Sequence, residues 1–254
     1  MSNLVLPTTT LWWRECVRFA RDRSRALSTI ATALVFWTLI GFGLRGSFAP
    51  ASMPIDVGAV EYLFPGTVIF VVLLTAIVST FSLIEDRRAG FLQGVLVAPV
   101  SRMAIVLGKV LGGSTVALIQ GALVLPLALI VGIPITVGGV ALALVALFCL
   151  AFALTSLGFV LAWRMESIHG FHGIVNLILM PMWFLSGALF PIAGAVGWLQ
   201  TIMRLNPIAY GLVSFRNALY GTSTAEWVGP GLAWMLTIAF AVVMFTIATR
   251  SIRR

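Results

Sequence analysis

Charged residues are scarce in this chain of 254 residues: 9% are Asp, Glu, Lys or Arg, and 60% are hydrophobic. A soluble domain carries about 25% charged residues, because its surface must be solvated. A large core cannot explain the deficit, since a soluble protein of any size still needs a polar surface. The composition and the mean hydropathy of +1.08 therefore indicate an integral membrane protein.

Cysteine and histidine are also rare, with two residues of each. Cys16 lies in a basic stretch and Cys149 in an apolar run, so we expect two unpaired thiols that pack as small hydrophobic side chains. His169 and His172 stand three residues apart near Glu166, and an H-E-x-x-H motif is absent. This pattern favours interfacial histidines over a metal site, so the sequence predicts neither metal ligands nor catalytic residues.

The motifs of an independent energy source are missing too. Lys109 follows Gly108, but Met103 and Val110 occupy positions where a P-loop requires Gly and Ser or Thr, so no ATP site is expected in this chain. No predicted span has a charged residue near its middle, and such residues are typical of ion-coupled carriers. The energy for transport would then come from elsewhere, and an ion-coupled secondary carrier is the alternative from a different class.

Long apolar runs dominate what the chain does contain. A spanning helix needs about 20 apolar residues, and backbone groups in lipid must be hydrogen-bonded within their own segment, which favours helices. Six runs qualify, at residues 26–44, 62–84, 104–131, 138–163, 171–190 and 230–249. The sequence therefore predicts an all-α integral membrane fold, with residues 1–254 in one transmembrane domain.

The basic residues predict how this domain is oriented. Thirteen of the sixteen Lys and Arg residues fall on one side of the six spans, and Arg45, Arg204 and Arg216 fall on the other. By the positive-inside rule, we expect both termini in the cytoplasm and a multi-pass location in the cell (inner) membrane. Orientation thus explains the net charge of +8, and no nucleic-acid partner is expected.

Two segments outside the spans have their own patterns. Residues 11–25, LWWRECVRFARDRSR, place four arginines on one arc of a helix and apolar side chains on another. This predicts an interfacial amphipathic helix with its arginines toward anionic lipid; packing on a cytoplasmic partner is a compatible alternative. Residues 191–229 are too apolar for a free loop and too rich in Pro and Gly for a span, so we expect short re-entrant helices in the outer leaflet.

One charged block, IEDRRAGFLQGVLVAPVSR at 84–102, connects the second and third spans. Its spacing predicts a short helix from Arg87 to Val97, with carboxylates at its N-terminal end and Pro99 at its end. Ser101 is then placed to cap the third span. The apolar stripe of this helix consists of Phe91, Leu92, Val95 and Leu96.

The longer stretch EDRRAGFLQGVLVAPVSRMAIVLGK, residues 85–109, resembles the signature of ABC-2 type transporter permeases. In that family an acidic and basic start, a Gly, an apolar helix, a P-x-S-R turn and a GK pair follow one another. LNPIAYGLVSFRNALYG at 205–221 and LSGALFPI at 185–192 resemble further parts of the family pattern. Gln93 departs from it, since the family often has Glu there.

This resemblance implies a type V ABC exporter in which the chain is the permease half and not an enzyme. Two copies would form a homodimer in membrane lipid, and a separate cytoplasmic ABC ATPase subunit would bind ATP and Mg. Residues 85–101 would form the coupling helix, with the apolar stripe in a groove of the ATPase and the arginines at a polar rim. The residues implied in ATPase coupling are Glu85, Arg87, Arg88, Phe91, Leu92, Val95 and Leu96.

Few polar side chains are available for a substrate pathway. Thr75, Ser79 and Ser82 share one face of the second span, and Asn176 lies in the fifth. This face would line a pathway or, alternatively, form hydrogen bonds between helices. Gly108 and the glycine four residues later form a G-x-x-x-G pair, which we expect to serve close packing.

The expected cargo follows from the apolar composition and from the family. An apolar cavity with few charges suits a hydrophobic or amphiphilic cargo. The resemblance implies a drug, a lipid or a lipid-linked glycan, and a polysaccharide or lipo-oligosaccharide exporter is the alternative within the family.

Overall fold

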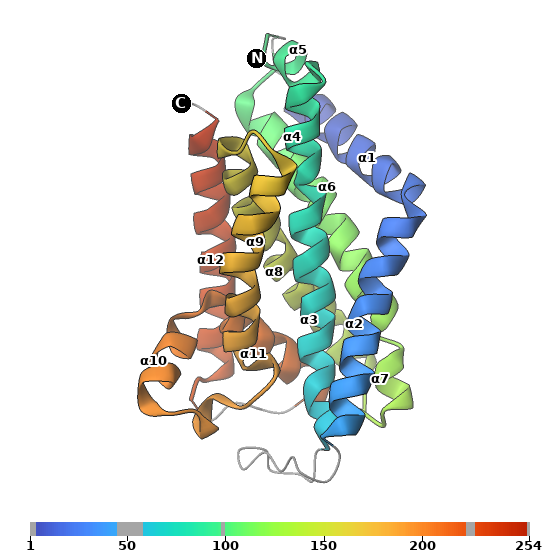
Figure 1. Ribbon diagram of the computed structural model, residues 1–254, viewed down its shortest axis with the longest axis vertical. Coiled ribbons are helices and arrows are strands. Elements are labelled where there is room, and N and C mark those ends of the chain that lie inside the picture. Colours follow the sequence, from blue (N-terminus) through green and yellow to red (C-terminus); the bar gives the residue numbers. More distant parts are fainter. Residues whose placement is uncertain (1–3, 45–57, 98–99, 222–226, 253–254) are drawn as a thin grey trace.

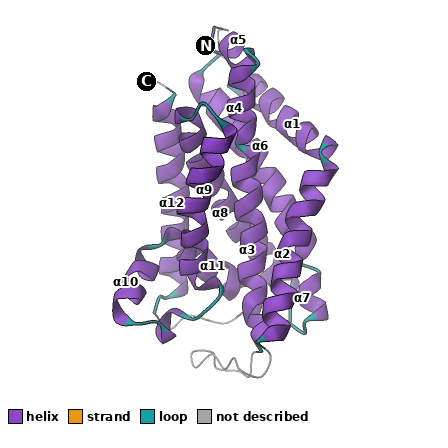
Figure 2. Ribbon diagram, viewed as in Figure 1, coloured by secondary structure: helices purple, strands orange, loops and turns teal. Residues whose placement is uncertain are grey.

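The computed structural model describes every residue except 1–3, 45–57, 98–99, 222–226 and 253–254. Within helices, the side chains at positions 23, 25, 26 and 96 are also outside the described part. Every regular element of the described residues is a helix (Figure 2). This confirms the prediction of an all-α fold.

The helices follow one another along the chain with short connections. Their bounds are α1 Val5–Arg21, α2 Arg23–Gly43, α3 Ala59–Ser79, α4 Phe81–Arg88, α5 Phe91–Val97, α6 Arg102–Val124, α7 Leu127–Ile130, α8 Val137–Arg164, α9 Ile168–Trp183, the π-helix η1 Phe184–Ala188, the 3-10 helix η2 Ile192–Gly194, α10 Gly197–Leu205, α11 Pro207–Tyr220 and α12 Pro230–Ser251.

Five helical stretches of the described residues are long and apolar enough to cross a membrane. They are Ala59–Arg88, Arg102–Ile130, Val137–Arg164, Ile168–Ala188 and Pro230–Ser251. Each covers one of the last five predicted spans to within a few residues. The first predicted span, 26–44, corresponds to α2, whose apolar part Leu27–Gly43 is shorter than the other five.

The helices form a bundle around α3, which contacts α2, α6 and α8 and is buried over most of its length. By contrast, α9 and α12 lie at the periphery and leave most of their side chains exposed. Figure 1 shows α1, α5 and the C-terminal end of α12 at one end of the bundle, which we call the terminal end. α7 and α10 lie at the opposite end, which we call the distal end.

α1 packs directly along α6 through two glycines. A Cβ atom on Gly108 would lie 2.8 Å from Leu11 Cβ, and one on Gly112 would lie 2.6 Å from Glu15 Cβ. Only glycine allows the two helices to approach so closely. The G-x-x-x-G pair therefore serves close packing, as predicted, and its partner is the N-terminal helix.

The bounds and the arginines of α1 differ from the prediction. The helix begins at Val5 rather than at residue 11, and it ends at Arg21. Arg14 and Arg18 form hydrogen bonds with carboxylates of α4. The prediction that they face anionic lipid is therefore wrong, because those carboxylates lie nearer to them than lipid does.

The charged block forms two helices where one was predicted. α4 ends at Arg88 and α5 begins at Phe91, because Gly90 adopts a φ of 74° that interrupts the helix. The prediction of one helix from Arg87 to Val97 is therefore wrong. Glu85 lies near the end of α4 rather than at the N-terminus of the coupling helix.

The start of α6 has the predicted cap. The Ser101 side chain accepts a hydrogen bond from the backbone N–H of Ala104 at 3.1 Å, which satisfies one of the free amides of the first turn. Pro99, which was expected to end the preceding helix, lies outside the described residues.

The predicted re-entrant segment consists of short helices, as expected. α11 begins with Pro207 after Asn206, whose side chain accepts a hydrogen bond from the N–H of Ile208 at 3.1 Å. It ends at Gly221, which adopts a φ of 69°. α11 contacts α8 and α12, so its broken backbone is buried in protein at membrane depth.

Candidate functional site

Six charged side chains from three helices meet at the terminal end of the bundle. We call this set the α1–α4–α6 junction. Its members are Arg14, Glu15 and Arg18 of α1, Glu85 and Asp86 of α4, and Lys109 of α6. Cations and anions are equal in number, so the junction as a whole is neutral.

Asp86 lies at the centre of the junction and is 3% exposed. Arg14 binds it through two hydrogen bonds, from Nη1 to Oδ2 at 2.8 Å and from Nη2 to Oδ1 at 2.6 Å. Lys109 Nζ also donates to Asp86 Oδ2, and Arg18 Nη1 donates to Oδ1 at 3.4 Å. A bidentate pair fixes geometry as well as charge, so one carboxylate joins three helices.

Lys109 is 6% exposed on an otherwise apolar helix. Its Nζ donates to Glu15 Oε1 at 2.5 Å and to Ser82 Oγ at 3.1 Å, in addition to Asp86. A buried ammonium is tolerated when its hydrogens find acceptors and its charge is paired. Three acceptors meet this requirement here, and loss of one carboxylate would leave excess positive charge in the junction.

The sequence analysis missed Glu15 and Lys109 as members of the site. A signal was present, because a lysine inside the predicted span 104–131 requires an acidic partner. The sequence could not say which acid, since 94 positions separate these two residues.

Arg14 also joins α5 to the junction. Its guanidinium carbon lies 4.1 Å from the centre of the Phe91 ring, which is a cation–π contact. The hydrogen bond to Asp86 raises the pKa of Arg14 above its ordinary value. Arg14 therefore holds α4 by an ion pair and α5 by a ring contact.

The predicted apolar stripe of α5 is divided between the interior and the surface. Leu92 is 3% exposed and packs in the apolar core, and Val95 packs partly against the same core. Phe91 is 40% exposed and Val97 is 87% exposed. The Leu96 side chain lies outside the described part. Leu92 thus supports the fold, contrary to its expected place in a partner's groove, and Phe91 and Val97 form the surface.

Arg87 and Arg88 contact the C-terminal end of α8 instead of standing free. Arg87 donates to the carbonyl of Trp163 at 2.7 Å and to that of Met165 at 3.2 Å. Arg88 donates to the carbonyl of Glu166 at 2.8 Å and 3.1 Å. Carbonyls at the end of a helix lack internal donors and carry partial negative charge. The two arginines therefore join α4 to the turn between α8 and α9.

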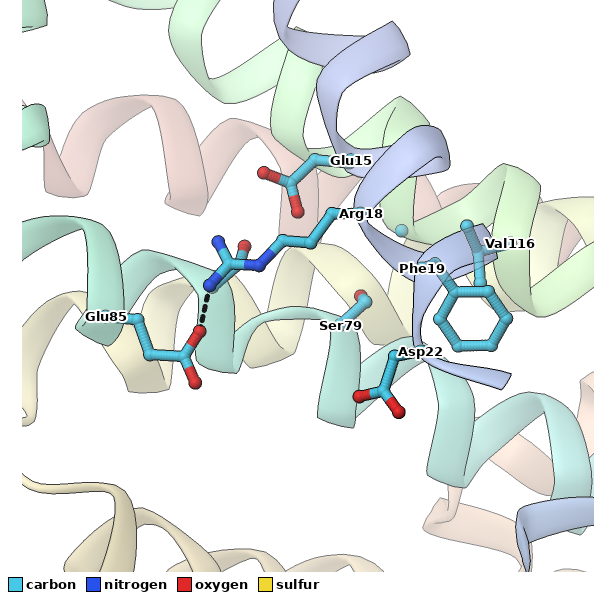
Figure 3. Close-up of a pocket in the computed structure, with 9 residues that line it drawn as sticks. Glu15, Arg18, Phe19, Asp22, Ser79, Glu85 and Val116 are labelled. Carbon is cyan, nitrogen blue, oxygen red and sulfur yellow. Dashed lines mark hydrogen bonds and ion pairs between the residues drawn. The ribbon is translucent and has the colours of Figure 1, made fainter. Parts of the chain in front are cut away.

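A cavity of about 230 Å³ lies beside the junction, between α1, the end of α3 with α4, and α6. Figure 3 shows Glu15, Arg18 and Ser79 around it, with Arg18 paired to Glu85. The complete lining is Glu15, Arg18, Phe19, Asp22, Ser79, Ser82, Glu85, Gly113 and Val116. The cavity combines paired charges and hydroxyl groups with two apolar side chains, so it can hold a group with both polar and apolar parts.

The cavity contains two of the four predicted pathway residues. Ser79 and Ser82 line it, whereas Thr75 is buried and donates a hydrogen bond to Gln120. Thr75 thus fits the alternative of hydrogen bonding between helices. Asn176 is exposed on the peripheral helix α9 and does not line the cavity.

The remaining candidate groups lie apart from the junction. The described residues include no cluster of three or more His, Cys, Asp or Glu side chains that could hold a metal ion. His172 lies edge-on against the ring of Phe81, with ring centres 4.5 Å apart. Cys16 and Cys149 are free and half-buried, and burial raises the pKa of the Cys16 thiol.

These contacts give the terminal end one mechanical property. α5 is joined to α4, α4 is joined to α1 and α6 by ion pairs, and α4 is joined to α8 by arginine–carbonyl contacts. Packed elements joined in this way move as a unit rather than deforming individually. A displacement of α5 would therefore reach four helices together.

An all-helical bundle with a charged junction at one end and broken short helices at the other defines a multi-pass α-helical membrane protein of the transport type. The family model of the ABC-2 type transporter matches residues 7–220. The chain therefore belongs to the ABC-2 transporter membrane family, as the signature at 85–109 predicted.

Curated relatives of the chain include transport permeases from several organisms. It is 27% identical to a putative transport permease, ycf38, of Cyanophora paradoxa, over 78% of this chain and 70% of the relative. It is 27% identical to the inner membrane transport permease YhhJ of Escherichia coli, over 85% of this chain and 56% of the relative. The daunorubicin resistance ABC transporter permease protein DrrB1 of Streptomyces coeruleorubidus is 22% identical, over 87% and 78% respectively.

Proposed function

We propose that this chain is the permease half of an ATP-driven ABC exporter that moves a hydrophobic or amphiphilic compound out of the cytoplasm or the inner leaflet. Two copies form the pathway, and a separate ABC ATPase binds ATP and Mg. Membership of the ABC-2 family and the likeness to ABC transport permeases support this proposal.

The observation that carries the proposal is the attachment of α5 to the bundle. α5 exposes Phe91 and Val97 at the terminal end, where a partner can reach them, while Arg14 and Asp86 join the same region to α1 and α6. A partner that presses on α5 thereby moves several spans. A chain without a P-loop motif needs such a receiving element, because its energy comes from another subunit.

The proposed orientation places α5 in the cytoplasm. The terminal end carries most of the basic residues of the chain, and the positive-inside rule assigns such an end to the cytoplasm. Both termini and the ATPase contact then lie on the side where ATP is present. The distal end, with α10 and α11, faces outward.

The cavity beside the junction supports an amphiphilic cargo. It lies at the depth of the inner headgroups in this orientation, and Ser79, Ser82 and Arg18 offer polar contacts next to Phe19 and Val116. An amphiphile in the inner leaflet presents its polar head at this depth. The name of the DrrB1 relative, a daunorubicin resistance permease, supports a drug as one such cargo.

The proposal is tested by co-expressing the chain with candidate ABC ATPases and reconstituting the complex in liposomes. Val97→Asp is expected to lower ATP-dependent transport by about tenfold or more, because a carboxylate would be desolvated in an apolar contact. The measurements are ATPase binding, ATP hydrolysis and cargo transport.

Val137→Asp is the matched control. Val137 is 91% exposed and begins α8 at the distal end, where a carboxylate favours the helix dipole. Its transport is expected to equal that of the wild type. Transport by Val97→Asp at the wild-type rate would contradict the coupling role, and transport without ATP would contradict the exporter.

A further inference from the structure

Three helices depart from regular geometry at one place near the distal end. α3 contains Pro65, and η1 at the end of α9 is a π-helix in which Gly187 adopts a φ of 87°. The neighbouring Gly66 packs so closely that a Cβ on it would lie 2.8 Å from Ala188 Cβ. π-helical turns inside longer helices frequently mark functional positions.

Arg216 of α11 lies in this place and is 7% exposed. Its Nη2 donates to the carbonyl of Gly187 at 3.0 Å and to that of Tyr62 at 3.2 Å. The guanidinium carbon lies 4.3 Å from the centre of the Tyr62 ring, and the Tyr62 hydroxyl donates to the same Gly187 carbonyl at 3.0 Å. One side chain thus joins α11 to α3 and η1.

A second contact follows one turn later on α11. Pro65 has no N–H, so the carbonyl of Glu61, four residues earlier, lacks its helical donor. The hydroxyl of Tyr220 donates to this carbonyl at 2.8 Å. The backbone of Glu61 is therefore held within one helical turn of Arg216.

The charges in this place are not paired with each other. None of the described ion pairs includes Arg216, and its Nε is buried without a hydrogen-bond partner. Glu61 Oε2 is likewise buried without a partner. A buried cation held only by carbonyls and a ring costs desolvation energy that an anion would offset, and the nearest unused anion is one turn away.

We propose that Arg216 is a positioning residue of the transport cycle: it holds α11 against η1 and α3 while the distal end is closed, and its guanidinium pairs with Glu61 when these elements separate. The inference rests on the exporter function proposed above. The contacts to Gly187 and Tyr62 stabilise the closed arrangement, and the Glu61 pair stabilises the open one. The distal end then has two arrangements with different partners for one cation.

The test measures access to Ser186, which is 2% exposed in η1. Ser186→Cys is made with Cys16→Ser and Cys149→Ser, and a membrane-impermeant maleimide is added from the distal side of reconstituted protein. Arg216→Gln is expected to raise the labelling rate about tenfold without ATP, because charge-assisted hydrogen bonds that favour the closed state are lost. Labelling at the unsubstituted rate overturns the proposal.

Arg204→Gln is the matched control. Arg204 is exposed on α10 and reaches only Gln200, so its labelling rate is expected to stay unchanged. If Arg216→Gln does not fold, Arg216→Lys replaces it, because an ammonium keeps the charge but not the planar fork that reaches both carbonyls. A rise in labelling supports the proposal, and an unchanged rate overturns it.

Glu61→Gln tests the second partner. In the complex with its ATPase, this variant is expected to keep the resting labelling rate and to lose most of the increase that ATP produces. An undiminished ATP effect overturns the role of Glu61. The resting comparison uses neither ATP nor cargo, so its outcome is independent of the outcome of the exporter test.

Discussion

Asp86 joins three helices because its two oxygens serve three cations. It is nearly fully buried, and Arg14 and Lys109 both donate to it. Glu85, its neighbour in sequence, is 36% exposed and pairs with Arg18 near the surface. Adjacent carboxylates thus have different energetic roles, because the ion pair of one is screened by water and that of the other is not.

Asp86→Asn is expected to lower the free energy of unfolding by about 3 kcal/mol, because it leaves buried cations without their shared anion. Glu85→Gln, the matched control, is expected to change it by less than about 1 kcal/mol, since an exposed pair contributes little. Chemical unfolding in detergent micelles measures both. Equal effects of the two substitutions would contradict the central place of Asp86.

Cys16 provides a test that depends on pH. Burial raises the pKa of its thiol, so the reactive thiolate is less populated at pH 8 than in free cysteine. In a Cys149→Ser background, alkylation of Cys16 is expected to be slow at pH 8 and to accelerate as pH rises through the raised pKa. Mass spectrometry of the alkylated protein follows the rate, with the denatured chain as control. Equal rates in the folded and denatured chains at pH 8 would count against burial as the cause.

At the scale of elements, the contact between α1 and α6 depends on the absence of two side chains. Gly112 faces Glu15 at a distance that no real Cβ atom could occupy. α1 therefore needs the glycines of α6 in order to bring Arg14 and Glu15 to Asp86 and Lys109. A close helix–helix approach is thus a condition for the charged junction.

Gly112→Ala is expected to expose α1 and to increase tryptic cleavage after Arg18 and Arg21 severalfold, even though Ala favours the helix by about 1 kcal/mol. Gly231→Ala in α12 is the control, because a Cβ there meets nothing within 4 Å. It is expected to leave cleavage unchanged. Limited proteolysis with mass spectrometry measures both, and resistance of Gly112→Ala to trypsin would contradict the packing argument.

At the scale of the whole molecule, α9 has a polar residue on its outer face. Asn176 is exposed in the middle of an otherwise apolar stretch, Ile168–Ala188. A polar amide facing lipid is unfavourable, and a second helix with a hydrogen-bonding partner would satisfy it. The proposed second copy of the chain fits this requirement.

Asn176→Cys, in a background with Cys16→Ser and Cys149→Ser, is therefore expected to form a disulfide-linked dimer on oxidation. Val243→Cys is the control: this residue of α12 is 50% exposed and apolar, so we expect it to face lipid. Non-reducing gel electrophoresis of oxidised membranes measures the dimer. Cross-linking through position 243 but not 176 would place the interface on α12 instead.

Much of the fold was predictable, and the limits of the prediction have specific causes. The apolar runs located the long helices, and Ser101 and Gly108 were assigned their cap and packing contact correctly. Gly90 was not recognised as a break, because a glycine in a short amphipathic pattern is also compatible with a continuous helix. Leu92 was assigned to the surface, because the stripe of a short helix does not say which half faces the core.

The sequence by itself determined that this chain is an α-helical membrane protein of the ABC-2 family, because insertion depends on hydropathy summed over about 20 neighbouring residues. Only the tertiary structure decided that Lys109 pairs with Glu15 and Asp86, and that Arg216 contacts carbonyls while Glu61 Oε2 stays unpaired. Those contacts join residues far apart in the chain, and their partners are selected by how closely the helices pack.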